Sequence, residues 1–181
     1  MNSGKTTALI QAAYNYEERG MKVLVLKPAL DTKGGNAVVT RIGLDRKADI
    51  LVRPEDSINA LLKDKPKANC ILVDEAQFLT PKQIDELFWY AVDEDVPVLT
   101  YGLRTDFQTQ GFPGSTRLLE LAHELQELKT VCRCGKKAVL NGRKLNGTFV
   151  NEGGQIAIED QDHIEYEALC AADYKKLVLN G

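Results

Sequence analysis

The sequence has no long hydrophobic run and no excess of charge of one sign. No stretch of about 18 consecutive apolar residues occurs, so no segment is expected to span a membrane. The 181 residues include 23 Lys and Arg against 26 Asp and Glu, a net charge of −3, which argues against a dedicated nucleic-acid-binding protein. The N-terminus lacks a basic region followed by an apolar stretch, so no signal peptide is expected. We therefore predict a cytoplasmic protein that binds neither nucleic acid nor membrane.

Cysteine is also scarce. The four cysteines, Cys70, Cys132, Cys134 and Cys170, are too few for a disulfide-stabilised scaffold. A single residue separates Cys132 from Cys134, which makes a disulfide between them geometrically awkward. In a reducing compartment, a close pair with a distant third indicates a metal site first. Cys70 lies inside an apolar run and is expected to be a small buried hydrophobic residue.

What the sequence does have is the composition of a globular protein, 44% hydrophobic and 27% charged. Its apolar residues alternate between two patterns. Short continuous apolar runs are typical of strands covered on both faces, and they occupy residues 23–26, 70–73 and 98–101. Helical spacing is found at residues 6–20 and 115–125.

Three residues mark the start of a further helix. Thr80 suits the N-cap, Pro81 the first helical position and Gln83 the position that closes a capping box. This helix is expected to continue to about Ala91. Strands that alternate with helices predict an α/β domain with a parallel sheet, which we assign to residues 1–128.

The character of the sequence changes after about Leu128. Residues 129–181 contain three of the cysteines, several Gly and Asn residues, and short alternating segments such as 155–158. We expect this part to be a small, loop-rich second domain. A bound metal would help to hold it together, because its own core would be small.

The sharpest functional signal is Ser3-Gly4-Lys5-Thr6 at the start of a predicted helix. In a phosphate-binding loop, backbone N–H groups and the helix N-terminus bind phosphate oxygens, a lysine reaches the β- and γ-phosphates, and a hydroxyl binds Mg²⁺. Gly4 would allow the close backbone approach, while Lys5 and Thr6 would supply the charge and the hydroxyl. The full pattern has a further glycine five residues before Gly4, outside this sequence, and four common residues also occur together by chance.

A second signal strengthens the first. The apolar residues 70–73 are followed directly by Asp74 and Glu75. In phosphoryl transfer, one carboxylate at such a strand end holds Mg²⁺ and a neighbouring one can act as a base. Two acids at a strand end can also be a solvated turn. Together with the lysine-containing loop, however, they favour nucleotide binding.

Several longer motifs occur together and in a fixed order. They are M-N-S-G-K-T at 1–6, V-D-E-A-Q-F at 73–78, Y-G-L-R-T-D-F at 101–107 and T-V-C-R-C-G-K-K-A at 130–138. With them, the chain resembles the type II thymidine kinases, the zinc-containing cytosolic class, over essentially its whole length. The resemblance implies a RecA-like P-loop fold with a zinc-ribbon lobe. It also implies transfer of the γ-phosphate of ATP to the 5′-hydroxyl of thymidine.

The resemblance also implies roles for individual residues. Glu75 would be the general base that accepts the proton of the 5′-hydroxyl. The residues expected to hold ATP and Mg²⁺ are Ser3, Gly4, Lys5, Thr6, Asp31 and Asp74. The residues expected to surround the thymidine base are Met1, Phe78, Leu103, Phe107, Phe112 and Tyr166. For the apolar members of this second set, ordinary core packing is the alternative.

For the metal, Cys132, Cys134 and Cys170 match three family ligands of a structural zinc ion. The family has Cys or His at the fourth position, three residues after the last cysteine, where this sequence has Asp173. A carboxylate oxygen can bind zinc, so Asp173 or water would complete the site. His163 is an alternative ligand, and a weakened or empty site is another. The resemblance also implies a lasso loop that covers the base, at about residues 143–166.

Two other classes of function are open at this point. D-E-A-Q resembles a helicase motif, so an ATP-driven nucleic-acid motor is one alternative, which the acidic charge and the single short domain oppose. A non-catalytic zinc-ribbon module with a decayed nucleotide site is the other, and Lys5, Thr6, Asp74 and Glu75 oppose it. The resemblance further implies a homotetramer inhibited by thymidine triphosphate.

Overall fold

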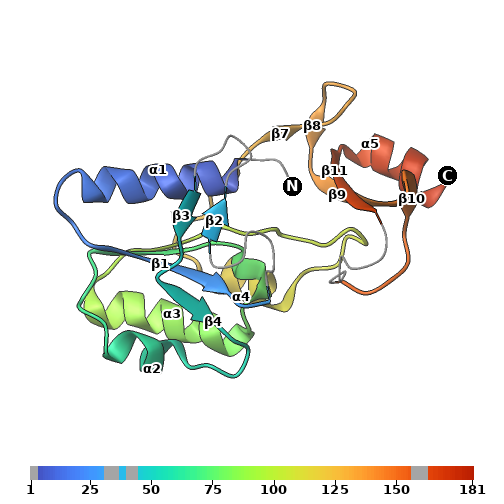
Figure 1. Cartoon of the computed structure of the whole chain (residues 1–181). Coiled ribbons are helices and arrows are strands. Elements are labelled where there is room, and N and C mark those ends of the chain that lie inside the picture. Colours follow the sequence, from blue (N-terminus) through green and yellow to red (C-terminus); the bar gives the residue numbers. More distant parts are fainter. Residues whose placement is uncertain (1–3, 31–36, 40–44, 156–162) are drawn as a thin grey trace. The chain divides into compact units, whose positions relative to one another are not determined.

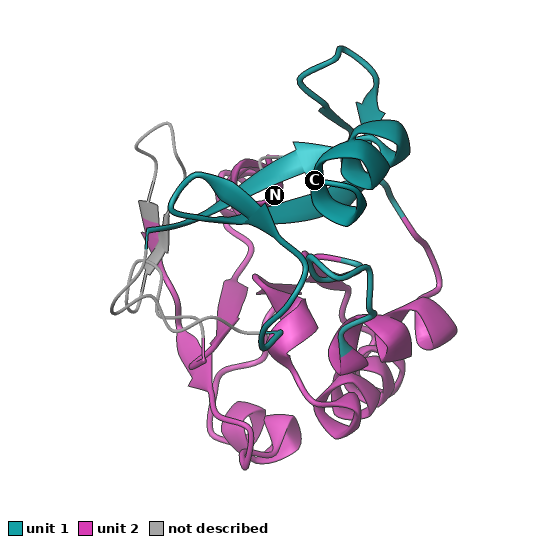
Figure 2. Cartoon of the chain, turned by 90° about the vertical axis from the view of Figure 1, so that its right-hand side faces the viewer, with its two compact units in different colours: residues 1–3, 104–112, 126–181 teal, residues 4–103, 113–125 magenta. Residues whose placement is uncertain are grey.

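The computed structural model describes residues 4–30, 37–39, 45–155 and 163–181, which fall into two compact units (Figure 2). The first, called here the sheet unit, comprises residues 4–103 and 113–125. The second, called the cysteine unit, comprises residues 104–112 and 126–181. The domain division after residue 128 stays a prediction.

A parallel sheet forms the centre of the sheet unit. Its strands lie in the order β4-β1-β5-β6, and all three pairings are parallel. The bounds are Val23–Pro28 for β1, Ile50–Val52 for β4, Cys70–Val73 for β5 and Val98–Thr100 for β6. The three predicted strands are therefore confirmed. Every residue of β1 and β5 is buried, as expected of continuous apolar runs between two layers of helices.

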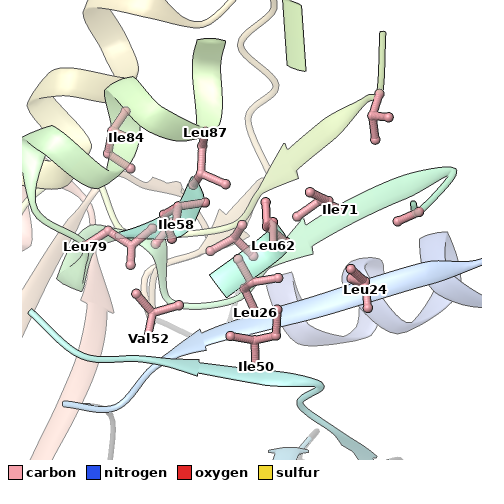
Figure 3. Packing of buried hydrophobic residues seen from close by; sticks show 14 residues of the cluster. Leu24, Leu26, Ile50, Val52, Ile58, Leu62, Ile71, Leu79, Ile84 and Leu87 are labelled. Carbon is pink, nitrogen blue, oxygen red and sulfur yellow. The ribbon is translucent and has the colours of Figure 1, made fainter. Parts of the chain in front are cut away.

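Helices cover both faces of this sheet (Figure 1). On one face, α1 (Lys5–Glu17) packs Leu9 and Ala13 against Val25 and Leu72. On the other face, α2 (Ile58–Lys63) and α3 (Pro81–Glu94) form a larger apolar cluster with the sheet (Figure 3). The predicted α/β fold with a parallel sheet flanked by helices is thereby confirmed. None of the helices within the described residues combines the length and apolarity needed to cross a bilayer.

Two sequence predictions in this unit are confirmed at residue level. Thr80 caps α3 in a complete capping box with Gln83, and Pro81 occupies the first turn. Cys70 is fully buried in β5. Burial raises the pKa of its thiol to about 11, so it packs as a neutral apolar group.

The helix predicted over residues 115–125 lies further toward the N-terminus than expected, since α4 spans Pro113–Leu121. Its first turn packs directly on the backbone of the short 3₁₀-helix η1 (Ala76–Phe78). A Cβ atom on Gly114 would lie 2.4 Å from the carbonyl oxygen of Leu79. Glycine is thus required there, and apolar periodicity alone could not place the start of α4 next to it.

Outside the main sheet, β2 (Ala37–Val39) and β3 (Asp45–Lys47) form an antiparallel pair. The cysteine unit contains the pair β7 (Thr130–Val131) and β8 (Lys137–Ala138), and a three-stranded antiparallel sheet with the order β10-β9-β11. The bounds of the latter strands are Leu140–Leu145 for β9, Thr148–Val150 for β10 and Ile164–Leu169 for β11. The short helix α5 (Ala171–Tyr174) and a π-helical turn, η2 (Lys175–Leu179), follow β11.

The lasso range, 143–166, has its two ends in paired strands. Arg143 of β9 lies directly opposite Tyr166 of β11, while residues 156–162 lie outside the described part of the chain. One step along β11, Glu167 accepts hydrogen bonds from Arg133 and pairs with Lys144 at 2.8 Å. These cations, Arg133 first, hold the pKa of the Glu167 carboxyl at about 2. The ends of the range are therefore firmly held by backbone pairing and by charge.

Candidate functional site

The lysine-containing loop enters α1 through a glycine. Gly4 has a φ of 73°, a left-handed conformation that glycine adopts without strain, and it is the N-cap of the helix. Lys5 and Thr6 are the first helical residues, and both are partly buried. The first-turn N–H groups of a helix are available to an anion. The expected residues Met1, Ser3 and Asp31 lie outside the described residues.

The two carboxylates follow β5 at its carboxyl end. Asp74 is 4% exposed, and its N–H donates to the carbonyl of Leu26 on the neighbouring strand at 3.0 Å. Glu75 has a φ of 46°, a left-handed conformation that costs energy for a residue with a side chain. That conformation turns the chain into η1 and leaves the Glu75 carboxylate 3.8 Å from the Lys5 ammonium. The structure therefore brings together two of the residues predicted for phosphate transfer.

A third residue, missed by the sequence analysis, holds Glu75. The side-chain amide of Gln77 donates to Glu75 Oε2 at 2.6 Å, and its oxygen accepts from the N–H of Leu103 at 3.1 Å. Gln77 is 2% exposed, and Gly102 fits against it because a Cβ there would come within 3.0 Å of Gln77 Oε1. The Leu103 N–H thus fixes which end of the Gln77 amide faces Glu75. The only signal in the sequence was a glutamine two residues after the proposed base.

The residues expected around the base are divided between the two units. Phe78, in η1, and Leu103 are partly buried in the sheet unit, and the Leu103 carbonyl accepts from the Ser115 hydroxyl at 2.5 Å. Phe107, Phe112 and Tyr166 belong to the cysteine unit. Of these three, Tyr166 is partly buried, whereas Phe107 and Phe112 are buried.

Comparison with known proteins decides which family carries this arrangement. The family model described as thymidine kinase matches residues 1–174. The chain belongs to the thymidine kinase family. The thymidine kinase of Haemophilus influenzae is 47% identical over 97% of this chain and 92% of its own length. The thymidine kinase of phage T4 is 44% identical over 98% of this chain and 92% of its own length. That of Ruegeria pomeroyi is 42% identical over 97% of this chain and 90% of its own length.

Membership of the thymidine kinase family also bears on the alternatives. It favours a phosphotransferase over a nucleic-acid motor, and the resemblance deduced from the short motifs is confirmed over nearly the full chain. The D-E-A-Q sequence, read alone, fits both classes. The two classes are distinguished by the other motifs in the same chain, namely C-R-C-G and Y-G-L-R-T-D-F.

The cysteine unit brings the four predicted metal ligands together. Cys132 and Cys134 lie in the turn between β7 and β8, which Gly135 closes with a φ of 82° and an N–H donated to the Cys132 carbonyl at 2.9 Å. Cys170 is the N-cap of α5, and Asp173 lies on that helix. The ligand atoms of Cys132, Cys134, Cys170 and Asp173 all lie within 4.8 Å of one another.

The spacing of these atoms fits a zinc ion. With Zn–S bonds of about 2.3 Å, two sulfur ligands of a tetrahedral site are about 3.8 Å apart, and Cys134 Sγ lies 3.6 Å from Cys170 Sγ. The Asp173 carboxylate lies 3.1 Å from Cys132 Sγ, so it faces the cluster. His163 is exposed and contacts Glu165, and it is not part of the cluster. The donor set of three sulfurs and one oxygen is therefore suited to a structural zinc.

Replacing Asp173 by alanine is expected to weaken zinc binding by about 10- to 100-fold or more, since even outer partners of a metal site contribute that much. Competition with a chromophoric chelator measures the affinity of the purified protein. The matched control is His163→Ala, which should leave the affinity unchanged. Release of zinc by His163→Ala with retention by Asp173→Ala would contradict this assignment of the fourth ligand.

Proposed function

We propose that this chain is a thymidine kinase that transfers the γ-phosphate of ATP to the 5′-hydroxyl of thymidine. The observation that carries the proposal is the approach of Lys5 and Glu75 at the carboxyl end of β5, 3.8 Å apart. The Lys5 ammonium is suited to bind a phosphate, and the Glu75 carboxylate is suited to accept the proton of a hydroxyl group. Family membership supplies the substrate class, since the relatives are named thymidine kinases.

Glu75 is proposed as the general base. Its carboxylate would take the proton of the 5′-hydroxyl as that oxygen bonds to the γ-phosphorus of ATP. The bond between this phosphorus and the β,γ-bridging oxygen breaks, which leaves ADP and thymidine monophosphate. A sugar hydroxyl is a weak nucleophile, so proton removal has to be well positioned. The hydrogen bond from Gln77 fixes one carboxylate oxygen and leaves the other toward Lys5.

The nucleotide would be held mainly by charge and by backbone N–H groups. Lys5 would bind the β- and γ-phosphates, while Thr6 and Asp74 would hold Mg²⁺, which neutralises the developing negative charge. At Gly4, a Cβ atom would meet no atom of the described residues within 4 Å. Ser3 and Asp31 are proposed to complete this set.

The wider proposal follows from the same family membership. Met1, Phe78, Leu103, Phe107, Phe112 and Tyr166 are proposed to surround the thymidine base. Zinc is proposed as a structural ion at Cys132, Cys134, Cys170 and Asp173. We further propose a cytoplasmic homotetramer that thymidine triphosphate inhibits.

The experiment that tests the function is phosphate transfer from labelled ATP to each of four deoxynucleosides. Selective formation of thymidine monophosphate is the expected result. Transfer to a different deoxynucleoside would contradict the proposed substrate. No transfer to any of them by folded, zinc-loaded protein would contradict kinase activity of this chain.

Replacing Gln77 by methionine is expected to lower kcat by about 10- to 100-fold, because a hydrogen bond to a charged group is lost while side-chain volume is kept. The KM for ATP should stay within about twofold of the wild-type value, since Gln77 contacts Glu75 and Leu103 rather than the phosphate loop. Steady-state kinetics measure both constants. Gln11→Met, on the exposed side of α1, is the matched control. An unchanged kcat in Gln77→Met would show that Gln77 does not position the base.

A further inference from the structure

A buried arginine at one end of the lasso range, 143–166, contacts several separate parts of the cysteine unit. Arg143, on β9, is 5% exposed. Its guanidinium donates to the Tyr166 hydroxyl at 3.0 Å and to the carbonyls of Gly154 and Gln155 at 2.9 and 3.1 Å. The guanidinium carbon also lies 3.6 Å from the centre of the Phe107 ring. One side chain thus holds three separate stretches of the unit.

The chemistry of these contacts needs arginine. Only a planar guanidinium can stack on an aromatic face while its N–H groups donate in several directions within that plane. A lysine ammonium is a compact charge with three rotatable donors. Within the described residues, Arg143 has no carboxylate at ion-pair distance. Burying a cation against neutral acceptors is costly, and the three hydrogen bonds and the ring contact of Arg143 offset that cost.

A second set of contacts, through Asp106, joins two of the same stretches. The Gln155 side chain donates to Asp106 at 3.0 Å, next to Phe107. Asp106 in turn accepts from the N–H groups of Gln108 and Gln110 at 2.8 and 2.9 Å. Arg143 therefore holds both Gly154 and Gln155, and Asp106 holds Gln155 as well.

The Phe107 side of the stack is fixed as well. The Tyr174 hydroxyl donates to the Phe107 carbonyl at 2.5 Å. This hydrogen bond fixes the backbone of Phe107, and with it the ring that the Arg143 guanidinium contacts.

We propose that Arg143 is a positioning residue for the thymidine base, acting through Phe107, Tyr166 and the carbonyls of Gly154 and Gln155. The inference rests on the proposed function, in which Phe107 and Tyr166 line the pocket for a flat pyrimidine. By joining both residues to Gly154 and Gln155, Arg143 would set the shape of the base pocket before the nucleoside binds. Preorganisation of this kind raises affinity by lowering the ordering cost of binding.

The test is Arg143→Lys, which keeps the charge but loses the planar donor set. We expect the KM for thymidine to rise by about 10- to 100-fold, the order of magnitude for lost hydrogen bonds to a charged group. The KM for ATP and the zinc content should stay within about twofold of wild type. Arg117→Lys, which changes a surface ion pair of the sheet unit, is the matched control and should alter none of these values.

A milder variant keeps the test decisive if Arg143→Lys does not fold. Gln155→Ala removes the contact with Asp106 and should raise the KM for thymidine by about threefold or more, as the loss of one hydrogen bond would. Gln108→Ala, which removes a contact with the Asn151 carbonyl in the same unit, is its control. Equal losses of affinity for thymidine and ATP, or loss of zinc, would make the role purely structural and overturn the proposal.

The outcomes also separate this inference from the proposed function. If the wild-type protein is active and both variants keep an unchanged KM for thymidine, only the proposed role of Arg143 is contradicted. Wild-type protein that phosphorylates no deoxynucleoside would contradict the proposed function itself. A rise in the KM for thymidine that is confined to the Arg143 and Gln155 variants supports both.

Discussion

Replacing Glu75 by glutamine is expected to lower kcat by about 10²- to 10⁴-fold, the usual contribution of a general base. The amide keeps the size and polarity of the side chain but cannot take the proton of the 5′-hydroxyl. Binding of thymidine and ATP should therefore be retained. Single-turnover phosphate transfer measures the rate of the chemical step, and equilibrium binding measures the affinity for thymidine and for ATP.

The matched control for this variant is Glu94→Gln, at the end of α3, where the carboxylate pairs with Lys67 on the surface. It should leave kcat unchanged, because exposed ion pairs of this kind contribute little. Near-normal turnover by Glu75→Gln would remove Glu75 from the role of base. Loss of thymidine or ATP binding, with the fold intact, would give Glu75 a binding role instead.

Replacing Lys5 by methionine is expected to lower kcat/KM for ATP by about 10²- to 10³-fold, the effect of removing one preorganised group that stabilises transition-state charge. Methionine keeps the unbranched chain and the helix propensity but has no ammonium for the phosphates. Lys5 is 11% exposed and 3.8 Å from Glu75, so its charge acts in a partly desolvated place. Steady-state kinetics with varied ATP at saturating thymidine provide the measurement.

Lys82→Met is the control, because Lys82 is 83% exposed and belongs to the outer surface of α3. Its kinetics should match those of the wild type. If kcat/KM for ATP were unchanged in Lys5→Met, the phosphate-binding role of Lys5 would be wrong.

The elements of the sheet unit could be predicted because their signals are local. The apolar runs of β1 and β5 indicate buried strands by themselves, and the residues Thr80, Pro81 and Gln83 define a helix start by their order alone. The start of α4 could not be predicted in this way. It depends on the packing of Gly114 against Leu79, and such a contact has no periodicity in the sequence.

The residues of the candidate site also differ in whether their signals are local in the sequence. Lys5, Asp74 and Glu75 belong to short motifs of neighbouring residues, so the sequence alone is enough to propose them as site residues. Gln77 contacts Glu75 and the distant Leu103, and Arg143 contacts Phe107 and Gln155. Contacts between residues that lie far apart in the chain need the folded structure before they can be recognised.

The close packing at Gly114 has a consequence for the mutations that this chain can accept. Every single-nucleotide change that turns a glycine codon into another amino acid adds a Cβ atom, and here that atom would lie 2.4 Å from the Leu79 carbonyl oxygen. The backbone of η1 would then have to move, and η1 follows Glu75 directly. Any side chain at position 114 should therefore disturb the segment that follows Glu75. A survey of tolerated substitutions is expected to find this position restricted to glycine.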